Sequence, residues 1–124
     1  MKYKIFDIHA HYDSDSFDED RENVIKELQE NGVIGVLNCG SDLYGLRKSV
    51  ELAKEFDMFY AAVGIHPENA DEFNDDVEKE IIELIRKNEK ILAIGEIGLD
   101  YYWEEIPPRE VQQDIFRRQM KLAE

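Results

Sequence analysis

The stretch VIGVLNCGSDLYGLRKSVELAKEF, residues 33–56, contains one complete strand-to-helix unit. Residues 33–37 form a continuous apolar run, which is typical of a strand buried inside a sheet. Residues 38–41, NCGS, interrupt that run, and beyond them Leu46, Val50 and Ala53 recur at helical spacing. The stretch therefore predicts a strand at 33–37, a turn, and a helix from about residue 43 to residue 56.

The same alternation continues on both sides of this unit. Further strands are predicted at residues 3–8, 58–63 and 91–94, and a helix is predicted at about 18–31. Asp75 or Asp76 can cap a third helix, and Pro107-Pro108 introduces a fourth. Strands joined by helical crossovers must run parallel. We therefore expect an α/β fold of four consecutive β-α units around a parallel sheet, in a single domain spanning residues 1–124.

Composition narrows the class of protein. The chain has 124 residues and a net charge of −14, which argues against a protein that holds nucleic acid through a basic surface. A nucleic-acid enzyme whose positive charge comes from metal ions remains compatible with it. A single cysteine, Cys39, allows no intrachain disulfide. Residues 1–7 lack the apolar core of a signal peptide, and no apolar run is long enough for a membrane span. We expect a soluble, cytoplasmic protein.

Four chemistry-bearing residues follow predicted strands: His9, His11, His66 and Glu96. In a parallel sheet the carboxyl ends of the strands open on one edge, where ligands bind. On an extended chain His9 and His11 project to the same side and can hold one divalent ion through neutral imidazoles. Glu96 could bridge two ions, and His66 could hold a substrate phosphate or a proton. Each also has a structural interpretation: polar strand ends, a solvated carboxylate, or a turn in which His66 caps a backbone carbonyl.

Other candidates have weaker support. Tyr101-Tyr102-Trp103 could stack on a base or sugar, but such a cluster more often packs down as a lid. Cys39 could be a nucleophile, but without a matched base a small buried residue is favoured. Ser16 and Glu19 could form a capping box for the first helix.

Four segments together resemble one family. FDIHAH (6–11), GIHP (64–67), GEIGLDY (95–101) and QDIFRRQMKLA (113–123) resemble the TatD family of metal-dependent deoxyribonucleases, within the amidohydrolase-like TIM barrels. The resemblance implies a (β/α)₈ barrel with two divalent ions, Mg, Mn or Zn, and hydrolysis of DNA phosphodiester bonds. It also implies that His9 and His11 bind one metal, Glu96 bridges both, and His66 lies near the substrate phosphate.

The chain departs from that family in length. A full barrel of this kind needs about 250 residues, whereas this chain has 124 and supplies four units. The family's later ligands, two histidines and an aspartate, have no counterpart here. The sequence therefore looks like the N-terminal half of a TatD-like barrel that carries part of the site. Because its edge strands would be open, we expect self-association or pairing with the missing C-terminal half.

Two alternatives stay open at this point. The chain could be a catalytically inert half-barrel that serves as an assembly module. It could also be another metallohydrolase, either a PHP-type phosphoesterase or an amidohydrolase, because a His-x-His after the first strand is shared among these. The GEIGLD segment at 95–100 favours the TatD family over both metallohydrolases.

Overall fold

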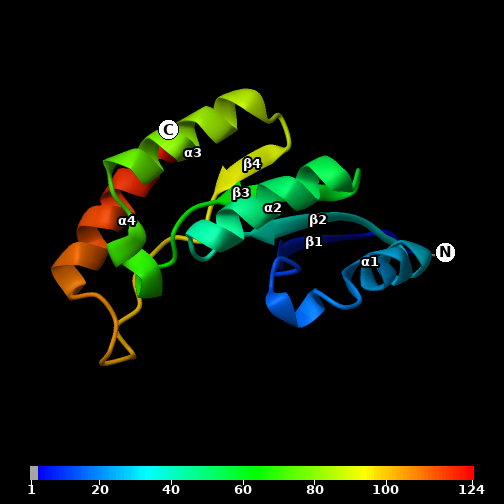
Figure 1. The fold of residues 1–124 in the computed structure, drawn as a ribbon, viewed down its shortest axis with the longest axis horizontal. Coiled ribbons are helices and arrows are strands. Elements are labelled where there is room, and N and C mark those ends of the chain that lie inside the picture. The colour runs from blue at the N-terminus through cyan, green and yellow to red at the C-terminus, as the bar shows by residue number, and fades with distance from the viewer. Residues whose placement is uncertain (1–2) are drawn as a thin grey trace.

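The computed structural model describes residues 3–124 and follows the predicted β-α alternation (Figure 1). Residues 1–2, part of the segment in which we expect no signal peptide, lie outside the described range. The strands are β1 (Ile5–Ala10), β2 (Val33–Cys39), β3 (Phe59–Val63) and β4 (Ile91–Ile94). The α-helices are α1 (Arg21–Glu30), α2 (Leu43–Glu55), α3 (Asp75–Lys87) and α4 (Arg109–Ala123), and two short 3₁₀ helices are η1 (Asp15–Phe17) and η2 (Pro67–Glu72).

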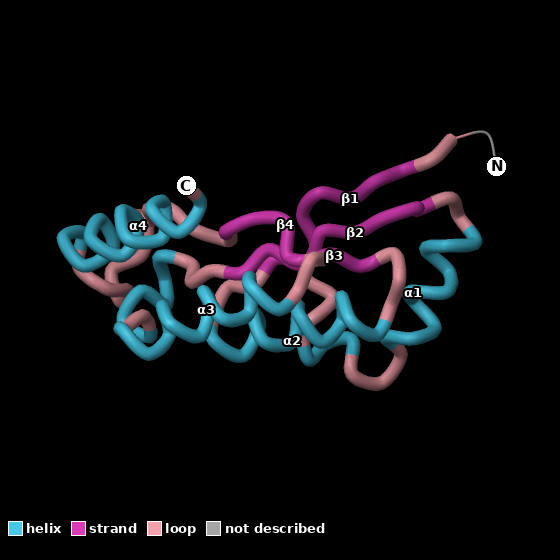
Figure 2. Tube along the Cα trace, turned by 90° about the horizontal axis from the view of Figure 1, so that it is seen from above, coloured by secondary structure: helices cyan, strands magenta, loops and turns pink. Residues whose placement is uncertain are grey.

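The four strands form one parallel sheet in the order β1-β2-β3-β4. Each strand pairs with its neighbour in sequence, as expected when every crossover is a single helix. Helices α1, α2 and α3 lie on one side of the sheet (Figure 2). The prediction of four consecutive β-α units with a parallel sheet is confirmed.

The core lies between the sheet and its helices. Leu46, Val50 and Ala53, the predicted inward positions of α2, are all buried. They join a cluster that also contains Val63 of β3 and Ile81 of α3. Complete burial of a side chain such as Ile81 contributes about 1.5–3 kcal/mol, so this cluster fixes the helices against the strands that carry the candidate site.

Several apolar side chains of the strands are left uncovered. Ile8 of β1 is 73% exposed, and Ile34 of β2 and Leu92 of β4 are 54% and 56% exposed. The strands β1 and β4 are the two edges of the sheet. An open parallel sheet of this kind is normally covered on both faces or closed into a barrel.

The ends of some elements differ from the prediction. Strand β1 ends at Ala10, so His9 lies inside the strand rather than past its end. Asn74, not Asp75 or Asp76, caps α3, because its Oδ1 accepts the Val77 N–H at 2.9 Å. Asparagine caps a helix as well as aspartate does.

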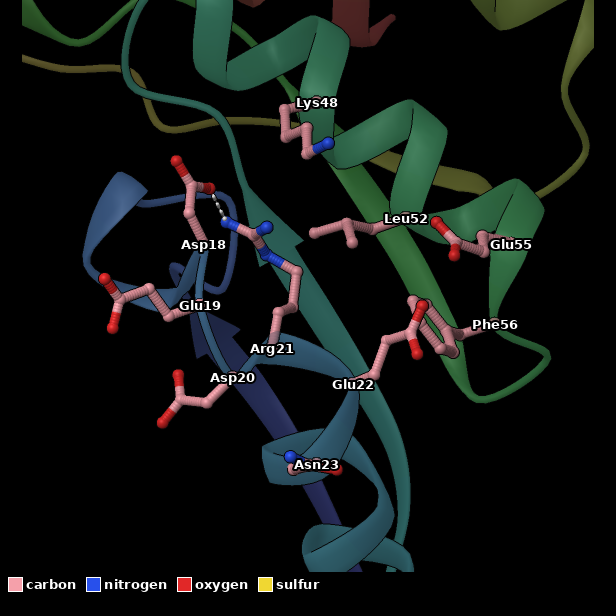
Figure 3. Close-up of a pocket in the computed structure, with 10 residues that line it drawn as sticks. All are labelled: Asp18, Glu19, Asp20, Arg21, Glu22, Asn23, Lys48, Leu52, Glu55 and Phe56. Atoms are coloured by element: carbon pink, nitrogen blue, oxygen red, sulfur yellow. Dashed lines mark hydrogen bonds and ion pairs between the residues drawn. The ribbon is translucent and has the colours of Figure 1, made fainter.

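The Ser16–Glu19 capping box is also wrong. Helix α1 begins at Arg21 after Asp20, whose side chain makes no capping hydrogen bond, and Ser16 lies inside η1. The cause is Arg21, which donates to the Tyr12 carbonyl at 2.7 Å and forms an ion pair with Asp18 at 2.8 Å (Figure 3). These contacts hold the preceding loop against the Arg21 guanidinium, so the helix begins at Arg21 rather than near residue 18.

Candidate metal centre

The loops at the carboxyl ends of the strands bring the four predicted residues together. His9 is the last residue but one of β1, and His11 directly follows that strand. His66 follows β3 as the N-cap of η2, and Glu96 follows β4. Residues that are 87 positions apart in sequence thus meet at one edge of the sheet, as the parallel topology requires.

The carboxylate of Glu96 lies between the histidines. His9 Nε2 and His11 Nε2 are 3.1 Å apart, and each lies 3.5 Å from Glu96 Oε2. The other carboxylate oxygen, Oε1, lies 3.7 Å from His66 Nε2. One oxygen of Glu96 therefore faces the His9–His11 pair and the other faces His66.

The donor set of His9, His11 and Glu96 fits a divalent ion. Two ligands that are each about 2.1 Å from a tetrahedral ion lie about 3.4 Å apart. The three separations among these ligand atoms, 3.1, 3.5 and 3.5 Å, are close to that value. All three side chains are partly exposed, so an ion can reach them from solvent. Two imidazoles and a carboxylate are ligands that zinc and manganese accept readily.

The orientation of His11 is fixed by the backbone. Its Nδ1 lies 2.9 Å from the Cys39 carbonyl oxygen, which can only accept, so Nδ1 carries the proton. In the neutral ring, Nε2 is then unprotonated, and its lone pair is available to the cluster. A metal-binding histidine is typically held by such a second hydrogen bond. The backbone N–H of His9 donates to Asp7 Oδ1 at 3.0 Å, which fixes the end of β1.

His66 has the opposite arrangement. Its Nδ1 accepts the backbone N–H of Glu68 at 3.0 Å, so the proton of the neutral ring lies on Nε2. That Nε2 is the ring nitrogen that lies 3.7 Å from Glu96 Oε1. The structural interpretation of His66 is therefore correct in part: the side chain caps a backbone N–H, not the expected carbonyl.

Three consecutive carbonyls hold these parts together. The Cys39 carbonyl accepts from His11, the Gly40 carbonyl accepts the Glu96 N–H at 2.8 Å, and the Ser41 carbonyl accepts the His66 N–H at 2.8 Å. The loop after β2 thus contributes no ligand of the cluster but contacts the segments that contribute them. A Cβ on Gly40 would lie 2.6 Å from the Leu46 Cα, so only glycine fits against α2 there.

A buried amide supports the same loop. Asn38 is fully buried, and its Nδ2 donates to Asp13 Oδ1 and to Ser49 Oγ, each at 2.8 Å. Its Oδ1 accepts the Tyr12 N–H at 2.6 Å. Because Tyr12 directly follows His11, Asn38 ties the segment after the His-x-His to β2 and α2. The sequence analysis missed Asn38; its signal is a polar residue at the end of an otherwise apolar strand.

The remaining candidates fall outside the cluster of ligand atoms. Cys39 is buried, as expected, and its burial raises the pKa of the thiol, which disfavours a nucleophilic thiolate. The expected packing of Tyr101-Tyr102-Trp103 as a lid is wrong, since Tyr102 is 81% exposed and Trp103 is 55% exposed. Tyr101 is also exposed, and the guanidinium of Arg109 lies over its ring, 4.4 Å from the ring centroid.

The cavity drawn in Figure 3 is separate from the cluster. It has a volume of about 340 Å³ and lies between the start of α1 and the end of α2. Its walls include Asp18, Glu19 and Glu55, and none of the four predicted site residues lines it. The converging side chains at the sheet edge, rather than this cavity, therefore form the candidate site.

Comparison with known proteins identifies relatives across almost the whole chain. The sequence model of a family described as TatD related DNase matches residues 6–124. An uncharacterized metal-dependent hydrolase of Bacillus subtilis, YabD, is 37% identical over 119 residues, covering 96% of this chain and 46% of the relative. The 3'-5' ssDNA/RNA exonuclease TatD of Escherichia coli is 32% identical over 119 residues, covering 96% of this chain and 45% of the relative.

Solved structures give the same result for the fold. YJJV, a TatD homolog from Escherichia coli, matches with a TM-score of 0.85 and 28% identity, covering 96% of this chain and 46% of that one. A TatD family hydrolase from Entamoeba histolytica matches with a TM-score of 0.89 and 25% identity, covering 98% and 46%. The chain thus spans about half the length of the proteins it matches, which confirms the expected half of a (β/α)₈ barrel. Within the described residues, no helix is long and apolar enough to cross a membrane.

Proposed function

The chain belongs to the TatD-related DNase family, and on this premise we propose that it carries part of the active site of a metal-dependent hydrolase that cleaves DNA phosphodiester bonds. The observation that carries the proposal is the convergence of His9, His11 and Glu96, whose ligand atoms all lie within 4.8 Å of one another. Divalent ions held there would offset the charge of the phosphate and make a water more acidic. Mg, Mn or Zn are the candidate ions.

Glu96 is the residue around which the site is built. One of its oxygens lies beside His9 and His11, which would hold the first ion, and the other lies on the side of His66. A carboxylate placed in this way can bridge two ions. The proposal therefore assigns His9, His11 and Glu96 to metal binding, and Glu96 would contribute to the binding of both ions.

His66 is proposed to act on the substrate rather than on the first ion. Its Nε2 carries the proton in the neutral ring because Nδ1 accepts the Glu68 N–H. A protonated Nε2 can donate a hydrogen bond to a phosphate oxygen and so stabilise the negative charge that develops there during cleavage. Glu96 and His66 are thus the proposed catalytic pair of this chain.

The charge of the chain is consistent with a substrate held through ions. A net charge of −14 provides little direct attraction for DNA. Metal ions held at the cluster would supply the positive charge locally. The prediction of a cytoplasmic location remains part of the proposal, and it is supported by the single free Cys39, which needs no oxidising compartment.

A second proposal concerns partners. The exposed Ile8, Ile34 and Leu92 support association through the uncovered part of the sheet, with a second copy or with a chain supplying the other half of the barrel. The inert assembly module is the alternative function that these exposed side chains favour. No feature of the described residues favours a PHP-type phosphoesterase or an amidohydrolase.

The test combines metal titration with a nuclease assay. Mn²⁺ is titrated into the 124-residue chain by calorimetry, and single-stranded DNA degradation is measured with and without a chain supplying the other half. We expect Glu96→Ala to abolish both metal binding and any degradation, and Glu89→Ala, which removes an exposed carboxylate of the chain, to leave both unchanged. Metal binding and degradation that survive Glu96→Ala would contradict the proposal. Metal binding without degradation under either condition would favour the inert module.

A further inference from the structure

Helix α4 buries two glutamine side chains seven residues apart, two turns along one face. Gln112 is 2% exposed and Gln119 is 1% exposed. An amide buried this deeply is costly unless both its oxygen and its nitrogen are hydrogen-bonded. Both glutamines meet that condition, and both do so through the backbone of a loop at the carboxyl edge of the sheet.

The side-chain amide of Gln119 bonds both backbone groups of one residue, Ile65. The Ile65 N–H donates to Gln119 Oε1 at 2.7 Å, and Gln119 Nε2 donates to the Ile65 carbonyl at 3.0 Å. Ile65 lies two residues beyond Val63, the last residue of β3. The Val63 carbonyl accepts a hydrogen bond from the Gly95 N–H, which follows β4, and Ile65 lies past that bond. The side-chain amide thus replaces a neighbouring strand where the sheet has ended.

This contact fixes the peptide group that leads into His66. The carbonyl of that peptide belongs to Ile65 and is bonded to Gln119, whereas its N–H belongs to His66 and is bonded to the Ser41 carbonyl at 2.8 Å. Because the peptide group is planar and rigid, holding both ends fixes its orientation. The His66 ring is then held by the Glu68 N–H at Nδ1, which leaves Nε2 facing Glu96.

We propose that Gln119 is a positioning residue that sets His66 against Glu96. The inference rests on the proposed role of His66 beside the substrate phosphate. Without the Gln119 amide, two buried backbone groups of Ile65 lose their partners, so the turn into His66 must shift to find others. The imidazole then loses its single orientation, while the segments that carry His9 and His11 keep their own contacts.

Gln112 provides a matched control on the same helix. It is equally buried, and it also makes one hydrogen bond through each end of its amide. Its partners are the Asp100 N–H at 2.9 Å and the Pro107 carbonyl at 2.8 Å, neither of which belongs to the peptide that leads into His66. Gln112→Met and Gln119→Met therefore each remove one buried amide and its two hydrogen bonds from the same helix, but they do so at different loops.

The experiment compares the two variants by long-range ¹H–¹⁵N spectra of the imidazoles in the metal-free chain. We expect both variants to lose stability to a similar extent in urea. Only Gln119→Met should lose the single His66 tautomer with a protonated Nε2, and the His9 and His11 signals should not change. A folded Gln119→Met protein with unaltered His66 signals would overturn the inference, as would an equal change of His66 in Gln112→Met.

A measurement on the unmodified chain decides the matter if Gln119→Met does not fold. If the amide holds Ile65, the Ile65 N–H should exchange with deuterium as slowly as the buried Ile115 N–H of α4. Exchange of Ile65 that is orders of magnitude faster than that of Ile115 would overturn the inference. Neither experiment uses metal or DNA, so failure of the proposed hydrolase activity and failure of this inference can be told apart.

Discussion

The imidazoles of His11 and His66 use the same ring atom, Nδ1, in opposite ways. His11 Nδ1 donates to the Cys39 carbonyl, and His66 Nδ1 accepts the Glu68 N–H. In the neutral rings His11 therefore offers an electron pair at Nε2, whereas His66 offers a proton there. Both Nε2 atoms lie near the Glu96 carboxylate, at 3.5 Å and 3.7 Å. The backbone thus gives two chemically identical side chains different capacities, since His11 can accept a metal ion or a proton at Nε2 whereas His66 can donate a hydrogen bond there.

This division predicts that the first metal depends on one histidine pair only. His9→Ala or His11→Ala removes a ligand, so Mn²⁺ affinity measured by calorimetry should fall at least about 10-fold. His66→Ala is the control and should leave the affinity of that ion unchanged, because its Nε2 is protonated. Equal losses in His11→Ala and His66→Ala would contradict the assignment of roles.

The affinity for the ion should also depend on pH. Imidazole binds a metal only in its neutral form, so protons compete with the ion and binding releases them. Mn²⁺ affinity should therefore fall as the pH is lowered, and the residual binding of a His9→Ala, His11→Ala double variant should depend less on pH. Calorimetry in buffers of different ionisation enthalpy measures the released protons. At a pH where free imidazole is largely protonated, binding that releases no protons would exclude the imidazoles as ligands.

The sequence predicted the fold and the convergence of the candidate side chains better than it predicted the contacts that orient them. Apolar runs alternating with helical spacing identify the four β-α units, and parallel topology then brings His9, His11, His66 and Glu96 to one edge. The contacts that orient these side chains are made with backbone carbonyls and amides, which nearly every residue type has, so they cannot be predicted from the sequence. Gln119 and Ile65, which pair at both backbone groups, lie 54 positions apart, beyond the reach of any local pattern. The missed start of α1 has the same origin, because Arg21 binds carbonyls of a preceding loop.

Gly40 is predicted to be intolerant of any side chain. A Cβ there would lie 2.6 Å from the Leu46 Cα, which is backbone and cannot rotate away. Gly40→Ala should therefore cost about 1–3 kcal/mol of unfolding free energy, as overpacking typically does. Gly95→Ala is the control, since the nearest atom to its Cβ, the Ala62 Cβ, is at an ordinary 3.6 Å. Urea unfolding measures both, and equal stabilities of the two variants would count against the close contact.

Asn38→Asp is predicted to make stability depend on pH. The change replaces the Nδ2 donor, 2.8 Å from Asp13 Oδ1, by a buried oxygen that faces a carboxylate. Burial and the neighbouring negative charge both raise the pKa of the new carboxyl in the folded state. A raised folded pKa means that the folded state binds the extra proton more tightly, so the loss of stability should be largest at neutral pH and diminish as the pH falls toward 4. Asn23→Asp, at an exposed position of α1, should show no such dependence in urea titrations at several pH values.

The uncovered strand side chains predict association. Ile34 of β2 and Leu92 of β4 are each more than half exposed on one sheet whose edge strands are paired on one side only, an arrangement that favours pairing with another chain. We expect the chain to sediment as more than a monomer at high concentration, and Ile34→Glu combined with Leu92→Glu to shift it to monomer while far-ultraviolet circular dichroism stays unchanged. Tyr44→Glu, at an exposed position of α2 on the covered side, is the control and should leave association intact. If the unmodified chain is strictly monomeric at high concentration, the prediction of association through these side chains is wrong.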